Sequence, residues 1–428
     1  MKSWIGPVAA GACVLAVAIA GSAPLSGQKA DEPWGGVLDE HPSIAYASRP
    51  TTDRVAALNQ ALAAGSRSLR REPQSGYLAS VLDALGVPVE SQLLVFSKTG
   101  VQRAHTGPHT PRAIFYNLSV VVAHVPGAPF LELAAQDPQQ GVVFYTLDQS
   151  AASPALKRQT SCLTCHVSAT TLNVPGMIVR SNTVDEGGNV MPQFGSYDVS
   201  HETPHPDRWG GWYVTSDPLA IPYAQRAHTG NITFTRGGST SNQVFVDWLN
   251  SVPETRGYLS AQSDIVALLV FDHQMRAINL LTRLNWEARV AAAGTSAAGV
   301  PEPAIGKLAN ELADYLLFLS EQPPSVPLIA RDGFAASLEP QAPKDRQGRS
   351  LAQLDLSTRL MRYPCSYMVY SEAFDGLPAA VKQLVYARMI DVLSSPDQRV
   401  SDARVSAADR RAVLEILRET KPDFPGHN

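Results

Sequence analysis

The sequence predicts an α+β protein, with helices and an antiparallel sheet in its N-terminal part and mostly helices in its C-terminal part. Between residues 91 and 147, apolar runs rich in β-branched and aromatic residues are separated by Pro and Gly turns, which is typical of short strands. Beyond residue 260, apolar residues recur every three or four positions, which is typical of helices that bury one face. A cysteine motif near residue 162 lies between the two patterns.

The N-terminus has the layout of a secretory signal. Lys2 is followed by an apolar run from Trp4 to about Ala20 and then by small residues, which correspond to the basic, apolar and cleavage regions. We therefore assign residues 1–30 to a signal peptide and expect an exported chain, periplasmic in a Gram-negative bacterium. An uncleaved N-terminal membrane anchor is the alternative, although the apolar run is short for a bilayer span.

Residues 31–150 are expected to form two short helices followed by strands. The helices are predicted at Thr52–Ala64 and Ser75–Leu85, where apolar residues share one face and a glycine follows the last turn. The strands are predicted to pair into a mostly antiparallel sheet just before the motif. They lie at 91–98, 113–125, 130–136 and 141–147, with further strands at 174–184 and 210–216.

Residues 251–428 are expected to be mostly helical. A long helix is predicted from Ser260, as its N-cap, to about Val290, with apolar residues on one face and a polar stripe from Asp272 to Glu287 on the other. A proline-rich, charged loop is expected at 322–350. Further helices are predicted at 304–320, 376–394 and 406–419.

The motif Cys162-Leu163-Thr164-Cys165-His166 carries the clearest chemical signal. In this CxxCH pattern, two thiols add to the vinyl groups of one porphyrin, and the adjacent histidine reaches the iron. By chance, roughly one chain in a thousand of this composition would contain the pattern. We therefore predict one covalent haem c, bound by Cys162 and Cys165 with His166 as an axial ligand, and a haem-c-binding segment at 151–250.

Two other uses of the motif are less consistent with the sequence. A structural zinc site usually has a second Cys/His pair at similar spacing, and the sequence offers none. A thioredoxin-type dithiol follows a buried strand in a βαβ unit, whereas residues 148–161 are polar and turn-like. Cys365 lies in an apolar, tyrosine-flanked stretch and is expected to be a buried free thiol. Intermolecular pairing or iron ligation is the alternative for Cys365.

The second axial ligand decides what the haem does. A His/Met pair raises the reduction potential and suits electron transfer, whereas an open position permits ligand binding or peroxide chemistry. Met191 lies in a Gly/Pro loop that could aim its thioether, while Met177 has apolar neighbours and fits the core better. The histidine candidates are His201, with His205 nearby, and His228, which is flanked by turn-forming residues. An open position is also consistent with the sequence.

The segment 206–215 supplies candidate contacts to the porphyrin. Arg208 could pair with a haem propionate, because a guanidinium binds carboxylates bidentately. Trp209 and Trp212 could cover the macrocycle edge and exclude water. A turn with aromatic packing, in which Arg208 binds carbonyl groups, is the alternative. Arg180 is a second propionate candidate.

Two further polar groups are expected to be structural. His273, in the middle of the long helix, is predicted to be a hydrogen-bonded structural histidine. The alternative is a role in proton delivery or a contact with a residue that binds the iron. The stretch Asp185–Asn189 is predicted to be a turn, because it lacks the spaced carboxylates of a calcium loop.

Across most of residues 75–420, the chain resembles a family of exported bacterial proteins with one CxxCH that are described only as cytochrome c-like. The segments that carry the resemblance are SQLLVFSKT, SCLTCH, VPGMIVRS, TPHPDRWGGWYVT, SDIVALLVFDHQ and GRSLAQLDLSTRLMRYPCSYMVYSEAFD. The resemblance implies a haem-c protein with an architecture of its own and a histidine at position 228. It implies no particular activity.

These observations predict an exported c-type cytochrome with one haem that passes single electrons to or from a redox partner protein. The alternative is a haem-dependent oxidoreductase or a peroxide or gas sensor, because the chain is longer than a bare electron carrier needs. The net charge of −4, from 35 basic and 39 acidic residues, argues against a nucleic-acid partner. No membrane partner is expected once the signal is removed.

Overall fold

The computed structural model describes residues 41–215, 257–294, 303–324, 327–330, 333–396 and 405–427, and the backbone of four short strands between residues 226 and 245. The predicted signal at 1–30 lies outside these residues, as does the side chain of His228. Residues Leu38–Asn428 form one compact unit.

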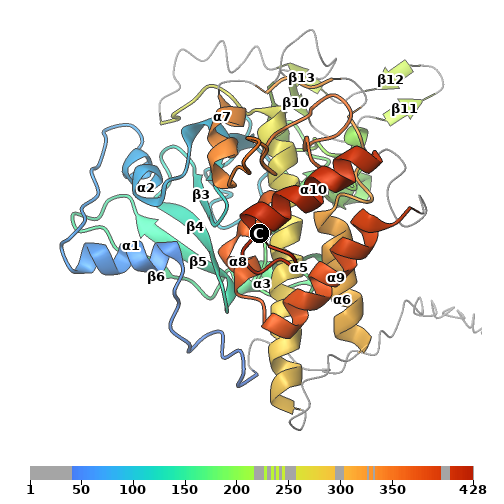
Figure 1. Ribbon diagram of the computed structural model, residues 1–428. Coiled ribbons are helices and arrows are strands. Elements are labelled where there is room, and N and C mark those ends of the chain that lie inside the picture. Colours follow the sequence, from blue (N-terminus) through green and yellow to red (C-terminus); the bar gives the residue numbers. More distant parts are fainter. Residues whose placement is uncertain are drawn as a thin grey trace, which may run out of the picture. The chain divides into compact units, whose positions relative to one another are not determined.

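An antiparallel sheet organises the N-terminal half of the protein (Figure 1). In the part of the chain that the structure describes, its strand order is β13-β10-β9-β1-β2-β3-β4-β5-β6, with antiparallel pairing throughout. Its strands are β1 Leu93–Val95, β2 Arg112–Tyr116, β3 Val120–His124, β4 Phe130–Asp137, β5 Gly141–Asp148, β6 Leu156–Arg158, β9 Trp212–Val214, β10 Arg226–His228 and β13 Gln243–Phe245.

Helices dominate the C-terminal half, and the predicted α+β class is therefore confirmed. The helices are α1 Arg54–Ala63, α2 Leu78–Leu85, α3 Leu163–His166, α5 Ile265–Gly294, α6 Pro303–Leu316, α7 Phe334–Leu338, α8 Glu372–Asp375, α9 Ala379–Ser394 and α10 Ala407–Thr420. Two small hairpins pair β7 Arg180–Asn182 with β8 Ser196–Asp198, and β11 Thr233–Thr235 with β12 Gly238–Thr240.

Both faces of the central sheet are buried, which explains the nearly continuous apolar runs of its strands. On β5, Val142 and Phe144 point into a core shared with α5. Val143 and Tyr145 alternate with them and point into a second core that includes α1 and α2. The sheet thus lies between two helical layers.

Helix α5 is the central helix of the protein, and Figure 1 shows it in yellow between the sheet and the orange and red C-terminal helices. By length and composition it could cross a bilayer, but 94% of its apolar window is buried inside the protein. Its predicted polar stripe is present but does not face solvent, since Asp272, Asn279 and Glu287 are buried. The polar stripe therefore contacts other parts of the chain.

Four local predictions need correction. Helix α5 is not capped by Ser260, because it begins at Ile265, where the Asp264 carboxylate accepts from the Val266 and Ala267 N–H groups at 2.6 and 3.2 Å. The 113–125 segment forms two strands, β2 and β3, separated by a turn. The expected loop at 322–350 contains α7, and the turn-like stretch before the motif contains the edge strand β6.

Candidate cofactor site at the CxxCH motif

The CxxCH motif forms a single helical turn, α3, close to the edge strand β6. The His166 N–H donates to the Cys162 carbonyl at 3.0 Å, which closes the turn. Residues three apart lie on the same side of a helical turn, so Cys162 and Cys165 are placed to bind one group. Both thiols are free, Cys165 is exposed and Cys162 is half-buried. Burial raises the pKa of Cys162, and the nearby Glu132 carboxylate raises it further.

The His166 ring is held in one orientation. Its Nδ1 lies 2.8 Å from the carbonyl oxygen of Gly176. A carbonyl can only accept a hydrogen bond, so Nδ1 carries the proton and Nε2 keeps its lone pair for a metal. The Phe144 ring packs against the imidazole at 4.6 Å. Burial lowers the pKa of His166, and the positive charge of Arg112 lowers it further, which favours the neutral ligand form.

The polar stripe of α5 holds the loop that supplies this carbonyl. The Asn279 side chain accepts from the Met177 N–H and donates to the Met177 carbonyl, each at 2.8 Å. Arg283 donates to the Leu172 carbonyl at 2.8 Å. Gly176 fits because it has no side chain, since a Cβ there would collide with Asn279 Oδ1 and lie 2.9 Å from Thr171 Cβ. A distant helix therefore positions the motif histidine.

The β7–β8 hairpin borders the motif on another side. Arg180 Nε donates to Asp198 at 2.8 Å, and Thr170, four residues after His166, bonds to both side chains at 2.9 and 2.8 Å. Arg180 therefore lies near the motif, although Asp198 and Thr170 already engage it. Met191 is partly exposed in the same hairpin, where its N–H donates to the Thr183 carbonyl at 2.8 Å.

The Asp185–Asn189 turn is confirmed. The Asp185 carboxylate accepts from the Gly187 and Asn189 N–H groups at 2.9 and 2.8 Å. Burial of Cys365 is also confirmed, and burial raises the pKa of its thiol.

Two charged residues near the motif, Arg112 and Glu132, were not among the predicted site residues. Arg112 on β2 and Glu132 on β4 approach to 3.8 Å across β3. Glu132 pairs on the sheet with Thr146 of β5, whose hydroxyl accepts from Gln159 Nε2 at 2.8 Å just before the motif. Beside the effects of burial, Glu132 raises the pKa of Cys162 and Arg112 lowers that of His166. The signal was available in part: Glu132 lies between Leu131 and Leu133, which places a charge on the opposite sheet face from two buried leucines.

In the 206–215 segment, Arg208 binds carbonyl groups and the tryptophans pack in the core, which was the alternative to contacts with a porphyrin. Arg208 Nε and Nη2 donate to the carbonyls of Thr203 and His201 at 2.7 and 2.8 Å, and Nη1 lies 3.8 Å from Asp272. Trp209 and Trp212 are core residues. Trp212 Nε1 donates to the Arg180 carbonyl at 2.8 Å, which ties this core to the hairpin.

His201 lies in a buried cluster with residues of α5 and α6. Its Nδ1 is 2.7 Å from Nδ1 of His273, whose Nε2 is 2.6 Å from Ser366 Oγ. Its ring stacks on Tyr315 at 4.1 Å. Burial lowers the pKa of His201, and lowers that of His273 to about 3, so both are neutral. These contacts agree with the structural role expected for His273.

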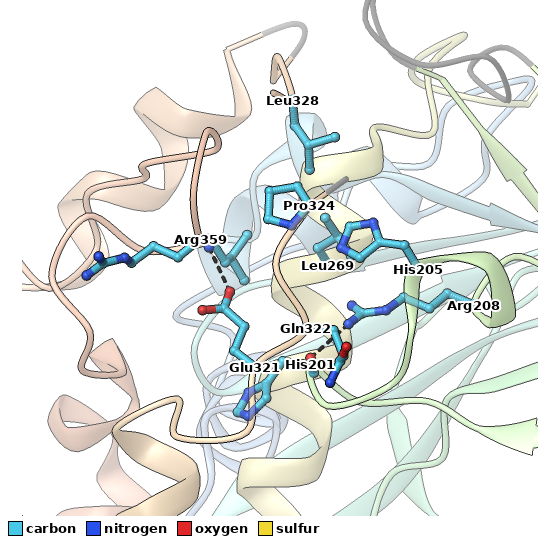
Figure 2. A pocket seen from close by; sticks show the side chains of 10 residues that line it. His201, His205, Arg208, Leu269, Glu321, Gln322, Pro324, Leu328 and Arg359 are labelled. Atoms are coloured by element: carbon cyan, nitrogen blue, oxygen red, sulfur yellow. Dashed lines mark hydrogen bonds between the residues drawn. The ribbon is translucent and has the colours of Figure 1, made fainter. Parts of the chain in front are cut away.

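Figure 2 shows a cavity beside this cluster, whose lining includes His201, His205, Arg208 and Glu321. Its volume of about 10 Å³ is room for about one water molecule. His205 is buried there, and burial lowers its pKa to about 3. The cavity is too small for a cofactor.

Within the described ranges, no group of three or more His, Cys, Asp or Glu side chains could hold a metal ion. A zinc site made of protein ligands alone is therefore not found there, whereas the paired thiols and oriented histidine at 162–166 suit an organic cofactor that brings its own metal. Comparison with family models, with curated proteins and with solved structures finds no match.

Proposed function

We propose that this protein is an exported c-type cytochrome that binds one haem covalently and exchanges single electrons with a partner protein. The observation that carries the proposal is the hydrogen bond from His166 Nδ1 to the Gly176 carbonyl. This bond leaves Nε2 unprotonated and therefore able to bind a metal. The CxxCH motif and the signal-like N-terminus of the sequence support the same proposal.

The residues of the site would have different roles in binding the haem. Cys162 and Cys165 would form the two thioether links, and His166 would be an axial ligand. Phe144 and the Asn279-held loop fix the imidazole against rotation. When bound, the haem would supply an iron centre that gains or loses one electron. A rigid axial ligand suits electron transfer, because the site would rearrange little when the charge of the iron changes.

Electron transfer is proposed ahead of catalysis because the axial histidine is rigidly held by Gly176 and Phe144. The cavities beside His201 and Met177 measure about 10 Å³ each and are lined by no residue of the motif, so neither offers a substrate site next to the expected iron. A haem-dependent oxidoreductase or a sensor would need an accessible iron position. We infer that Met191 or His228 closes that position, because the imidazole of His201 is engaged by His273.

The optical spectrum of the purified holoprotein tests this function. We expect a six-coordinate low-spin spectrum that peroxide and carbon monoxide leave unchanged. Met191→Ala or His228→Ala should convert it to a high-spin spectrum, whereas His201→Ala should stay low-spin. A high-spin parent protein that responds to either ligand would contradict electron transfer and support the enzyme or sensor.

A further inference from the structure

Arg112 is a buried guanidinium with few good hydrogen bonds. Its side chain is 16% exposed and its closest anion, Glu132, lies 3.8 Å away. Its bonds to the carbonyl and hydroxyl of Thr99 are both 3.5 Å, the limit of a useful hydrogen bond. Its Nε has no hydrogen-bond partner among the described residues. A buried cation in this state costs free energy unless another group binds it.

The partner of Arg112 is also incompletely bonded. Glu132 is 23% exposed, and its Oε1 has no hydrogen-bond partner in the described part of the chain. The strand between the two, β3, contributes only the small side chain of Ala123 opposite Glu132. Gly100, at φ +87°, lets the backbone approach the guanidinium, because a Cβ there would lie 2.5 Å from Arg112 Nη1. The chain thus leaves one guanidinium edge available beside the motif.

We propose that Arg112 binds a propionate carboxylate of the haem, an inference that rests on the proposed function. The Nε–H and one Nη–H of a guanidinium match the two oxygens of a carboxylate, which is the bidentate pairing that arginine prefers. Glu132, 3.8 Å from Arg112, pairs across the sheet with Thr146, whose hydroxyl accepts from Gln159 Nε2 at 2.8 Å, three residues before Cys162. The guanidinium therefore lies beside the motif. Arg208 and Arg180 are poorer choices, because carbonyls and Asp198 already engage them.

The role of Arg112 has a consequence for the reduction potential. A fixed positive charge beside the haem favours the reduced state, which carries one positive charge less. It also keeps the propionate ionised, so the potential should not vary with pH. Glu132 is the charged group that faces Arg112, at 3.8 Å, and the motif residues Cys162 and His166 would be consumed in holding the haem.

The experiment compares covalent haem content and midpoint potential in the full-length holoprotein from about pH 5 to pH 8, above the usual range of a free carboxyl. Arg112→Gln should keep its haem, shift the midpoint to lower potential and make it fall with rising pH. Arg112→Lys keeps the positive charge, so its midpoint potential should lie close to that of the parent. Arg349→Gln is the matched control, because Arg349 is 15% exposed and bonds Asp345 and Glu415 away from the motif.

The outcomes separate the two proposals. An Arg112→Gln potential equal to the parent's at every pH overturns the propionate assignment, as does a shift found in Arg180→Gln instead. If Arg112→Gln does not accumulate, Arg112→Lys decides: a midpoint slightly below the parent's supports the assignment, because an ammonium cannot make the bidentate pairing, and a midpoint equal to the parent's at every pH overturns it. Absence of covalent haem from the parent protein contradicts the proposed function itself.

Discussion

His166 Nδ1 lies 2.8 Å from the carbonyl oxygen of Gly176, and Asn279 on α5 holds the next residue, Met177, through two bonds of 2.8 Å. The orientation of the motif histidine therefore depends on a helix more than a hundred residues later in the chain. This relationship makes the loop at Gly176 a structural part of the site.

Replacing Gly176 with alanine should disturb both the fold and the site. The new Cβ would collide with Asn279 Oδ1 and press on Thr171, so we expect a loss of about 1–3 kcal/mol in the free energy of unfolding. Chemical denaturation measures the loss, and the haem content of the exported protein should fall with it. Gly306→Ala in α6 is the matched control, because its Cβ meets nothing within 4 Å and alanine should stabilise that helix by about 0.5–1 kcal/mol. Equal stability of Gly176→Ala and the parent would show that the loop is not tightly held.

Acid should destabilise the protein through its buried histidines. Burial lowers the pKa of His273 to about 3, whereas the unfolded value is about 6.5. Between these values the unfolded state binds a proton that the folded state does not, so stability is full above about pH 6.5 and falls as the pH drops. One such histidine contributes a loss of about 1.4 kcal/mol per pH unit in this range.

The comparison of His273→Gln with the parent isolates this effect. Asp272, whose pKa burial raises to about 7, acts with the opposite sign and is present in both proteins. Urea unfolding at pH 7.5 and pH 5.5 should show a smaller acid loss in His273→Gln. The exposed His105→Gln variant should keep the loss of the parent. An identical acid loss in His273→Gln and the parent would mean that His273 is not buried and neutral.

Cys365 should be unreactive until the protein unfolds. It is buried, and burial raises the pKa of its thiol, so little thiolate is exposed to a reagent. In the exported holoprotein, titration with a disulfide reagent should detect no thiol in buffer and one in denaturant, since the motif thiols would be bound. Three reactive thiols in denaturant would contradict covalent attachment, and one in buffer would contradict the burial of Cys365.

The sequence predicted the elements of this protein better than their contacts. The helices and most strands follow from apolar periodicity. The error at Ser260 arose because Asp264, an equally good N-cap, lies directly before the first helical turn. The polar stripe of α5 was visible in the sequence, but not the loop that it binds. Arg112 comes near His166 only because β2 pairs with β3 while the motif folds back onto Phe144 of β5. Such contacts depend on strand register and long-range folding, which a single sequence does not specify.

The most direct test of the account is the intact mass of the exported protein after denaturation. The account predicts a chain heavier than its mature polypeptide by the mass of one haem, with the added mass retained by the peptide that contains Cys162 and Cys165. Cys162→Ala combined with Cys165→Ala should lose this mass, whereas Cys365→Ala should keep it. A denatured chain with the mass of the bare polypeptide, from cells that mature other c-type cytochromes, would contradict the account.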